Sequence, residues 1–259
     1  MSQAFKRSKI ASAIVMILSV AIAIIIWFRD RDHHVIVPII ASTLMLGIGY
    51  FSSRVLGNVL ASMENTRYLG YLHMELDPEK FLAHYEGLPN RMKGSDAAVC
   101  RSYLADGYAA AGRFDEAVQT LSPEPPADNL PVQGLYASNR AGYYLGKGDA
   151  QGAAEAIAAL EEVIDACRLQ KAELANNLTV SLKIHKQHLN CLTGKSVNTG
   201  WLEDAFKSAQ YNLRRLEIAR ILAMAALRDG DSASAKKKLS FLRKNGEKTW
   251  YKKWADRQV

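Results

Sequence analysis

Two long uncharged stretches dominate the pattern of apolar and polar positions near the start of the chain. One runs from Ile10 to Phe28 and the other from Val35 to Ser53, and each has nineteen residues without a charged side chain. An α-helix of that length reaches about 28 Å, close to the roughly 30 Å hydrocarbon core of a bilayer. Because lipid offers no hydrogen bonds to the backbone, a segment that crosses it must be helical. The pattern therefore predicts two transmembrane helices that form a hairpin and anchor the chain through residues 1–54.

A cleaved signal peptide is the alternative interpretation of the first stretch. The stretch is longer than the roughly 7–15 apolar residues of a signal peptide, and it ends at Trp27, Phe28 and Arg29 instead of small residues. A second apolar stretch follows almost at once, so we expect both to remain in the protein. Neither stretch has an ionisable side chain, which disfavours transport or proton relay within the membrane.

Basic residues near the two stretches predict their orientation. Those outside the hairpin are Lys6, Arg7, Lys9, Arg54 and Arg67, and those in its turn are Arg29 and Arg31. Because basic residues favour the cytoplasmic side, this distribution predicts that both termini and the soluble part are cytoplasmic. The three cysteines include no C-x-x-C pair, which suits a reducing compartment.

Beyond the second stretch the chain stays partly apolar before it becomes soluble in character. Apolar positions with polar insertions continue from Val55 to Arg67, which predicts that the helix extends into a stalk over residues 55–76. Asp77 followed by Pro78 then predicts a new helix, with Asp77 as its N-cap and Pro78 at its first position. We expect a soluble helical domain over residues 77–259.

One pattern recurs in this domain, from Ala98 to Asn245: an Ala-rich apolar helix, a turn with glycine, and a second helix. The turn glycines are Gly112, Gly148, Gly194 and Gly230, separated by 36, 46 and 36 residues. A period of about 20–50 residues is typical of a helical array, and glycine ends helices in the left-handed conformation at little cost. Proline-rich residues 122–131 separate the first two pairs, and no alternation typical of strands is present. The pattern predicts an all-α fold.

The repeat resembles the tetratricopeptide family. The first instance carries the match in Leu104, Ala105, Tyr108, Gly112, Phe114, Ala117 and Leu121. Later instances depart from it: Arg140 replaces a large apolar residue, Ala226 replaces an aromatic one, and the third pair is degenerate. The resemblance implies an α-solenoid of helix pairs whose first helices line a concave, peptide-binding face.

The resemblance also implies which residues lie on that face. Mapping the repeat onto this chain places Tyr103, Asp106, Ser138, Asn139, Arg220 and Met224 there. The family's carboxylate-clamp variety has Lys and Asn where Val99, Ser102 and Asp106 stand in the first repeat, so capture of an acidic C-terminus is not expected.

Other motifs offer little chemistry. Gly194, Lys195 and Ser196 match the end of a phosphate-binding loop, but Leu189 occupies the position of its first glycine. His185, His188 and Cys191 are spaced three apart on a predicted helix, yet a zinc site needs further converging ligands. We interpret them as a partly exposed helix face, and we expect no catalytic residue, cofactor or metal site.

Positive charge gathers at the end of the chain. Residues 236–259 hold nine basic and two acidic residues, a net +7 that equals the formal charge of the whole chain, and Trp250, Tyr251 and Trp254 lie among them. The segment is either a solvated cap of the array or a surface for anionic lipid. The lysines expected on such a surface are Lys236, Lys237, Lys238, Lys252 and Lys253. Nucleic-acid binding through phosphate contacts and stacking is less favoured.

These features favour a multi-pass membrane protein whose helical-repeat domain is a scaffold for a protein or peptide partner at the cytoplasmic face. The alternative is a peripheral sensor of anionic lipid that acts through the basic C-terminal segment. A membrane-bound α-helical enzyme is the less favoured third class, because no arrangement of catalytic side chains is visible.

Overall fold

The computed structural model describes residues 3–29, 36–168 and 171–258, without the side chains of residues 3–9, 36–38 and 61. Every regular element over these residues is helical, which confirms the predicted all-α class. The chain divides into two compact units, Met1–Tyr68 and Leu69–Val259. The second unit therefore begins within the range that the sequence assigns to a stalk.

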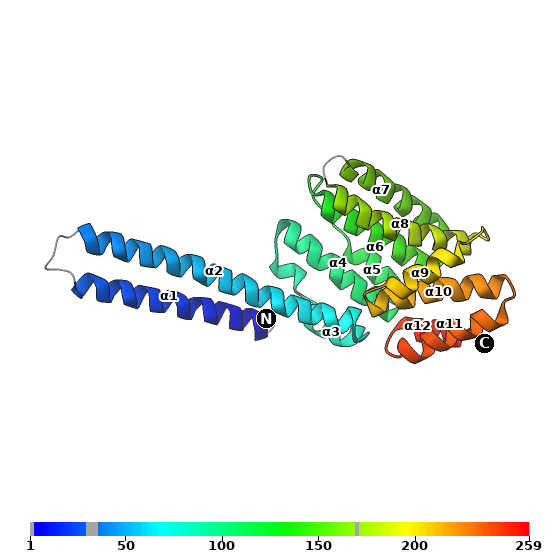
Figure 1. The fold of residues 1–259 in the computed structure, drawn as a ribbon, viewed down its shortest axis with the longest axis horizontal. Helices are drawn as coiled ribbons and strands as arrows, with labels where there is room; N and C mark the ends of the chain where they lie inside the picture. The colour runs from blue at the N-terminus through cyan, green and yellow to red at the C-terminus, as the bar shows by residue number, and fades with distance from the viewer. Residues whose placement is uncertain (1–2, 30–35, 169–170, 259) are drawn as a thin grey trace. The chain divides into compact units, whose positions relative to one another are not determined.

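The first unit contains α1 (Gln3–Arg29) and most of α2 (Ile36–His73), which lie side by side (Figure 1). Both helices are long and apolar enough to cross a membrane, over Ile10–Arg29 and Ile39–His73. The two predicted apolar helices are therefore present, and the second does continue past Ser53. The predicted turn, with Arg31 and Val35, lies outside the described residues.

Small and hydroxyl-bearing residues make the contacts between α1 and α2. The Ser12 hydroxyl donates to the Ser53 carbonyl over 2.8 Å, and the Ser42 hydroxyl donates to the Ala23 carbonyl over 3.2 Å. Gly49 faces α1 so closely that a Cβ atom there would collide with Ser19. Such contacts are typical of helices that associate in lipid, where large apolar side chains gain nothing by facing one another.

The second unit continues from the end of α2 through ten more α-helices in its described residues (Figure 1). They are α3 (Pro78–Tyr85), α4 (Gly94–Ala111), α5 (Phe114–Thr120), α6 (Leu130–Lys147), α7 (Ala150–Arg168), α8 (Ala172–Leu192), α9 (Thr199–Ser208), α10 (Asn212–Arg228), α11 (Ser232–Asn245) and α12 (Trp250–Asp256), with a 3-10 turn at Pro89–Arg91. The core of this unit is apolar and includes Phe81, Leu145, Leu160 and Leu216, all without solvent exposure.

The repeat glycines end helices as the sequence predicts. Gly112, Gly148, Gly194 and Gly230 have φ of +87°, +85°, +73° and +75°, a region that side chains with a Cβ rarely adopt. Gly112 is constrained twice, because a Cβ there would also lie 2.8 Å from Cβ of Trp250. The proline-rich break is shorter than predicted: Pro131 lies in the first turn of α6, which Asn129 caps.

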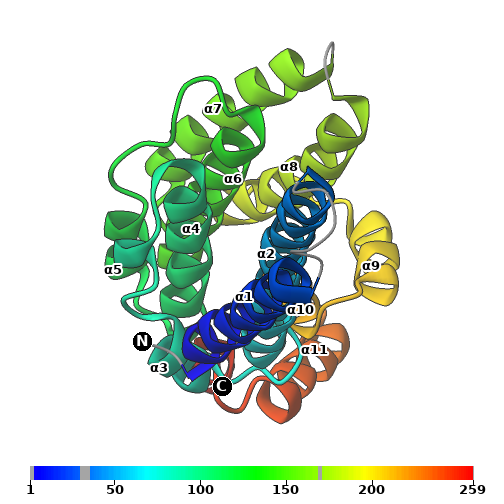
Figure 2. The same cartoon turned by 90° about the vertical axis from the view of Figure 1, so that its left-hand side faces the viewer.

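The helices before these glycines pack in sequence order. α4 contacts α6, α6 contacts α8 and α8 contacts α10, while α5, α7 and α11 pack against α4, α6 and α10. In Figure 2 α4, α6 and α8 follow one another across the second unit. The helices that the sequence predicts as first members of each pair are thus neighbours in space.

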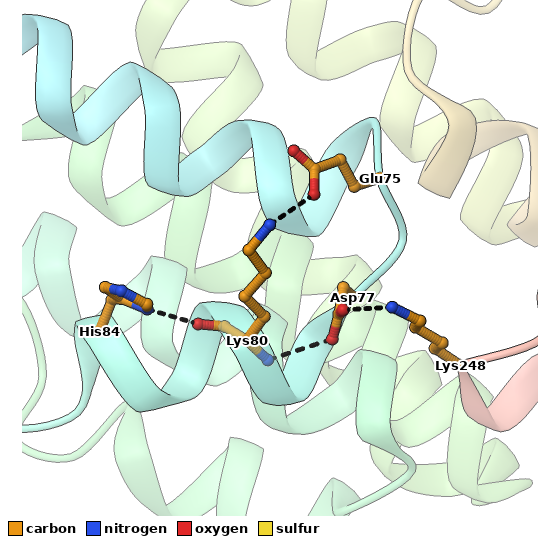
Figure 3. A network of polar contacts seen from close by, with 5 residues as sticks. All are labelled: Glu75, Asp77, Lys80, His84 and Lys248. Carbon is orange, nitrogen blue, oxygen red and sulfur yellow. Dashed lines mark hydrogen bonds and ion pairs between the residues drawn. The ribbon is translucent and has the colours of Figure 1, made fainter.

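The C-terminal helix closes this arrangement. α12 contacts both α10 and α4, and the Trp250 ring meets the Phe114 ring edge to face at 4.9 Å. Lys248 pairs with Asp77 over 2.5 Å, and Asp77 accepts a hydrogen bond from the Lys80 amide as the predicted N-cap of α3 (Figure 3). The two ends of the second unit are therefore tied together.

Candidate functional site

The second unit contains a partly open cavity of about 300 Å³, lined mainly by residues of α4, α6, α8, α10 and α12 and also by His73 of α2 and Phe114 of α5. Five of the six residues that the resemblance assigns to the concave face line it: Tyr103, Asp106, Ser138, Asn139 and Arg220. Met224 does not; it lies one turn beyond Arg220 on α10. The volume of the cavity is at the lower end of the range for ligand pockets.

One wall of the cavity is acidic. Tyr143 donates a hydrogen bond to Asp106 over 2.6 Å. Burial outweighs the hydrogen bonds from Tyr143 and Asn139 and the charge of Arg214, and it raises the pKa of Asp106 to about 6. This carboxyl is therefore mostly ionised and a hydrogen-bond acceptor at pH 7, and it becomes a donor as pH falls below 6.

Another part of the lining carries a buried cation. Arg220 is 5% exposed, and its guanidinium lies 4.7 Å from the Trp250 ring centre and 5.2 Å from that of Trp254. One of its terminal nitrogens is 2.9 Å from Nε2 of His188. Desolvation lowers the Arg220 pKa to about 10, so the group remains charged at neutral pH.

The histidines of α8 are buried, which corrects the prediction of a partly exposed helix face. His185 and His188 are each 3% exposed and Cys191 is 8% exposed. Burial lowers the pKa of His185 to about 4, and burial also holds the pKa of His188 well below its usual value, so both are neutral at pH 7. Nε2 of His185 is 3.1 Å from the Ser138 hydroxyl. Among the described residues no group of three potential ligands could hold a metal ion.

A second hollow adjoins the cavity. It shares Phe114, Gly146, Arg220 and Trp250 with the cavity and has a volume of about 560 Å³. Its charged lining residues are all basic: Lys147, Lys253, Arg257 and Arg220. Lys147 is paired with Asp115 over 2.5 Å. The hollow therefore gives the cavity a positively charged entrance.

The basic C-terminal segment is less exposed than the sequence predicts. Lys238 is 7% exposed and pairs with Glu203 over 2.8 Å, which removes it from any lipid-facing surface. Lys252 is half-buried and pairs with Asp256 over 3.1 Å. Lys236, Lys237 and Lys253 are exposed. The segment is part of the packed unit and is not only a solvated cap.

Sequence reasoning missed several lining residues. Tyr143 lies four positions after Asn139, and Glu217 and Arg214 lie three and six before Arg220. The helical period that relates neighbours on one face could have found these three. Trp250 and Tyr251 could not be found this way, because their helix reaches the cavity only through long-range packing.

Comparison of this chain with family models, with curated proteins and with solved structures gives no match. The tetratricopeptide resemblance therefore stays a prediction, and function is inferred from the geometry of the cavity and of the apolar helices.

Proposed function

We propose that the chain is a membrane-anchored helical-repeat protein whose soluble unit binds a short segment of a protein or peptide partner in this cavity. The observation that supports the proposal is that α4, α6, α8 and α10 all contribute polar side chains to one hollow. These are the helices whose concave face binds peptides in the family that the repeat resembles. The mixture of carboxyl, amide, phenol and guanidinium groups suits a peptide, which presents donors and acceptors together.

The anchor in this proposal is a transmembrane hairpin of α1 and α2. It is supported by the exposure of large apolar side chains on both helices, among them Ile17 at 67% and Phe51 at 70%. The distribution of basic residues favours cytoplasmic termini. Single cysteines replacing Asp32 and Asp128, labelled in intact cells by an impermeant reagent, test the orientation. Labelling at position 32 alone supports it, and labelling at position 128 contradicts it.

A photoreactive amino acid in the cavity tests partner binding. We would place it at Leu135, which lines the cavity, and at Val180, an exposed position on α8, in full-length protein in native membranes. A discrete adduct at Leu135 and none at Val180 is the expected result. Ala109→Phe, which fills the cavity, should abolish the adduct, whereas Ala154→Phe on the exposed face of α7 should not. An adduct that survives Ala109→Phe would contradict the proposal.

Sensing of anionic lipid is the second candidate. Exposure of Lys236, Lys237 and Lys253 favours it, whereas the packing of Trp250 against Phe114 and the pairing of Lys238 weaken it. Lys236→Gln with Lys237→Gln should leave the Leu135 adduct intact if the cavity, and not the lipid surface, carries the function.

A further inference from the structure

Arg220 is a buried cation without an acidic partner. No described carboxylate lies within ion-pair distance of its guanidinium, and Glu217, one turn away on α10, is engaged by Arg214 over 2.9 Å. Lys238, buried to a similar degree at 7%, has its partner in Glu203. Because an unpaired charge is costly to bury, buried cations in proteins are normally paired. Arg220, the buried cation without a carboxylate partner, lines the cavity.

The neighbours of Arg220 leave its hydrogen-bonding edge incompletely used. The rings of Trp250 and Trp254 both lie against the guanidinium, at 4.7 and 5.2 Å. Aromatic rings neutralise no charge, and they leave the N–H groups at the edge of the plane for an acceptor. His188 takes one of these N–H groups, but Nε of Arg220 has no hydrogen-bond partner among the described residues.

The cavity also has two acidic lining residues, Asp106 and Glu217, and Oε1 of Glu217 lies 3.9 Å from Nδ1 of His185. An anion is therefore suited only to the part of the cavity at Arg220 and the adjoining hollow. The adjoining hollow presents Lys253 and Arg257 beside Arg220, and no acidic side chain is among its described lining residues. Basic groups along an entrance attract anions and raise their local concentration.

We propose that the cavity receives an anionic group, a carboxylate or a phosphate, and that Arg220 binds it. This inference deepens the proposed function, since it assumes that the ligand lies in the same cavity and assigns the charge of the part that enters it. A guanidinium fits both groups, because its parallel N–H bonds match pairs of carboxylate or phosphate oxygens. The anion also supplies the counter-charge that Arg220 lacks.

Thermal unfolding and tryptophan fluorescence of the full chain in detergent micelles test the proposal. Inorganic phosphate and succinate are the two probes, and sodium chloride of equal ionic strength is the control. Either probe should raise Tm through preferential binding to the folded state, and it should change the fluorescence saturably because Trp250 and Trp254 flank Arg220. A response to phosphate alone shows that the site prefers a phosphate group, and a response to succinate alone shows that it prefers a carboxylate. No response to either probe beyond that to chloride would overturn the proposal.

Arg220→Met, with Arg228→Met as its matched control on the exposed end of the same helix, assigns the response to one residue. Arg220→Met should weaken probe binding by about tenfold or more, as loss of hydrogen bonds to a charged group does. Its Tm without probe reflects two opposing effects, because Met removes an unpaired buried charge but also the N–H group that bonds His188. Arg228→Met should leave binding unchanged. Undiminished binding in Arg220→Met would overturn the proposal.

A second variant covers the case in which Arg220→Met does not fold. Lys253→Gln with Arg257→Gln changes exposed residues at the entrance. It should weaken both probes several-fold without lowering Tm, and equal affinity would overturn the role of the entrance. The Leu135 adduct separates the two proposals: an adduct without any anion response retains partner binding and removes the anionic group.

Discussion

In α1 and α2 the side chains of Phe28 and Phe51 are 67% and 70% exposed, whereas in the second unit Phe81 and Leu145 are completely buried. The polar contacts are reversed as well. Ser53 is 5% exposed and meets Ser12 between the two apolar helices, while charged pairs such as Lys147 with Asp115 lie on the surface of the second unit. The same helical backbone thus carries two opposite distributions of side chains.

The difference is the one expected if the first unit lies in lipid, as we propose, and the second in water. Large apolar side chains are driven inward by water, and that force disappears where the surroundings are as apolar as the side chain. In such surroundings helices gain most by bringing small residues and hydroxyl groups together. The side chains of the first unit are distributed as the proposed lipid anchor requires, and those of the second unit as water requires.

The largest expected effect comes from a charge in the middle of the apolar run of α2. Leu44 is 61% exposed there, and Leu44→Arg should disfavour membrane insertion by about 3–4 kcal/mol. Leu44→Ala is the control. Because α1 would still hold the chain in the membrane, the readout is labelling of a cysteine at position 128 by an impermeant reagent in intact cells. Labelling should appear in Leu44→Arg, whose second unit would be left outside, and not in Leu44→Ala. If neither variant is labelled, the comparison with a lipid-facing helix is wrong for α2.

Acid should destabilise the second unit through its buried histidines. The pKa of His185 is about 4 in the folded protein and 6.5 when exposed, so the unfolded state binds the proton first. The free energy of unfolding is therefore unaffected by His185 above pH 6.5. As pH falls from 6.5 to 4, protonation of His185 in the unfolded state lowers that free energy by about 3 kcal/mol. In His185→Gln, which retains a partner for Ser138, the free energy of unfolding should decrease much less over the same pH range. Denaturant unfolding of the full chain at several pH values measures this. Ser138, Glu217 and Arg214 are the other polar groups that influence His185. An identical pH profile in the variant would contradict the assignment.

Overpacking should distinguish close contacts in the second unit from its surface. Ala117 is completely buried between helices, and Ala117→Leu should cost about 1–3 kcal/mol. Ala154, exposed on α7, provides the control substitution Ala154→Leu. Equal melting temperatures for the two variants would count against close helix packing at Ala117.

Removing the acidic group from the cavity should have an effect of opposite sign to that of the histidines. The folded pKa of Asp106, about 6, exceeds its usual 3.8, so its contribution to stability decreases as pH rises from 4 to 6. Asp106→Asn should therefore stabilise the protein at pH 7.5 by about 1–2 kcal/mol, allowing for partial exposure to solvent. Asn can still accept the hydrogen bond from Tyr143. A loss of stability at pH 7.5 would show that the charged carboxylate is favoured by its surroundings.

The smallest effects concern the contact between the two ends of the second unit. Asp77→Ala removes the N-cap of α3 and should cost about 1 kcal/mol. Lys248→Ala removes only the exposed partner of Asp77, and its melting temperature should stay at the wild-type value. A larger loss from Lys248→Ala than from Asp77→Ala would make the ion pair, and not the cap, the main contribution.

Much of the local structure could be predicted from single positions in the sequence. The uncharged run from Ile10 to Phe28 predicts a helix because its length and polarity suffice. Asp77 and Pro78 predict a helix start, and Gly112 and Gly148 predict helix ends, because capping depends on the residue at the cap itself. Local rules failed where a side chain meets distant parts of the chain. His188, whose surroundings include Arg220, gives no local sign that it is buried.

The sequence by itself determined that the chain is helical and where its two apolar helices lie, because these properties depend on residues within a few turns of one another. That Tyr103, Asp106, Ser138 and Asn139 share a face was implied by the resemblance to a repeat family, and the structure places all four on one cavity. Only the tertiary structure decided that α12 returns to α4, that Lys238 is paired, and that Arg220 is buried without an acid. Burial and charge pairing depend on which surfaces meet across long separations in the chain, and the spacing of residues along a helix does not determine that.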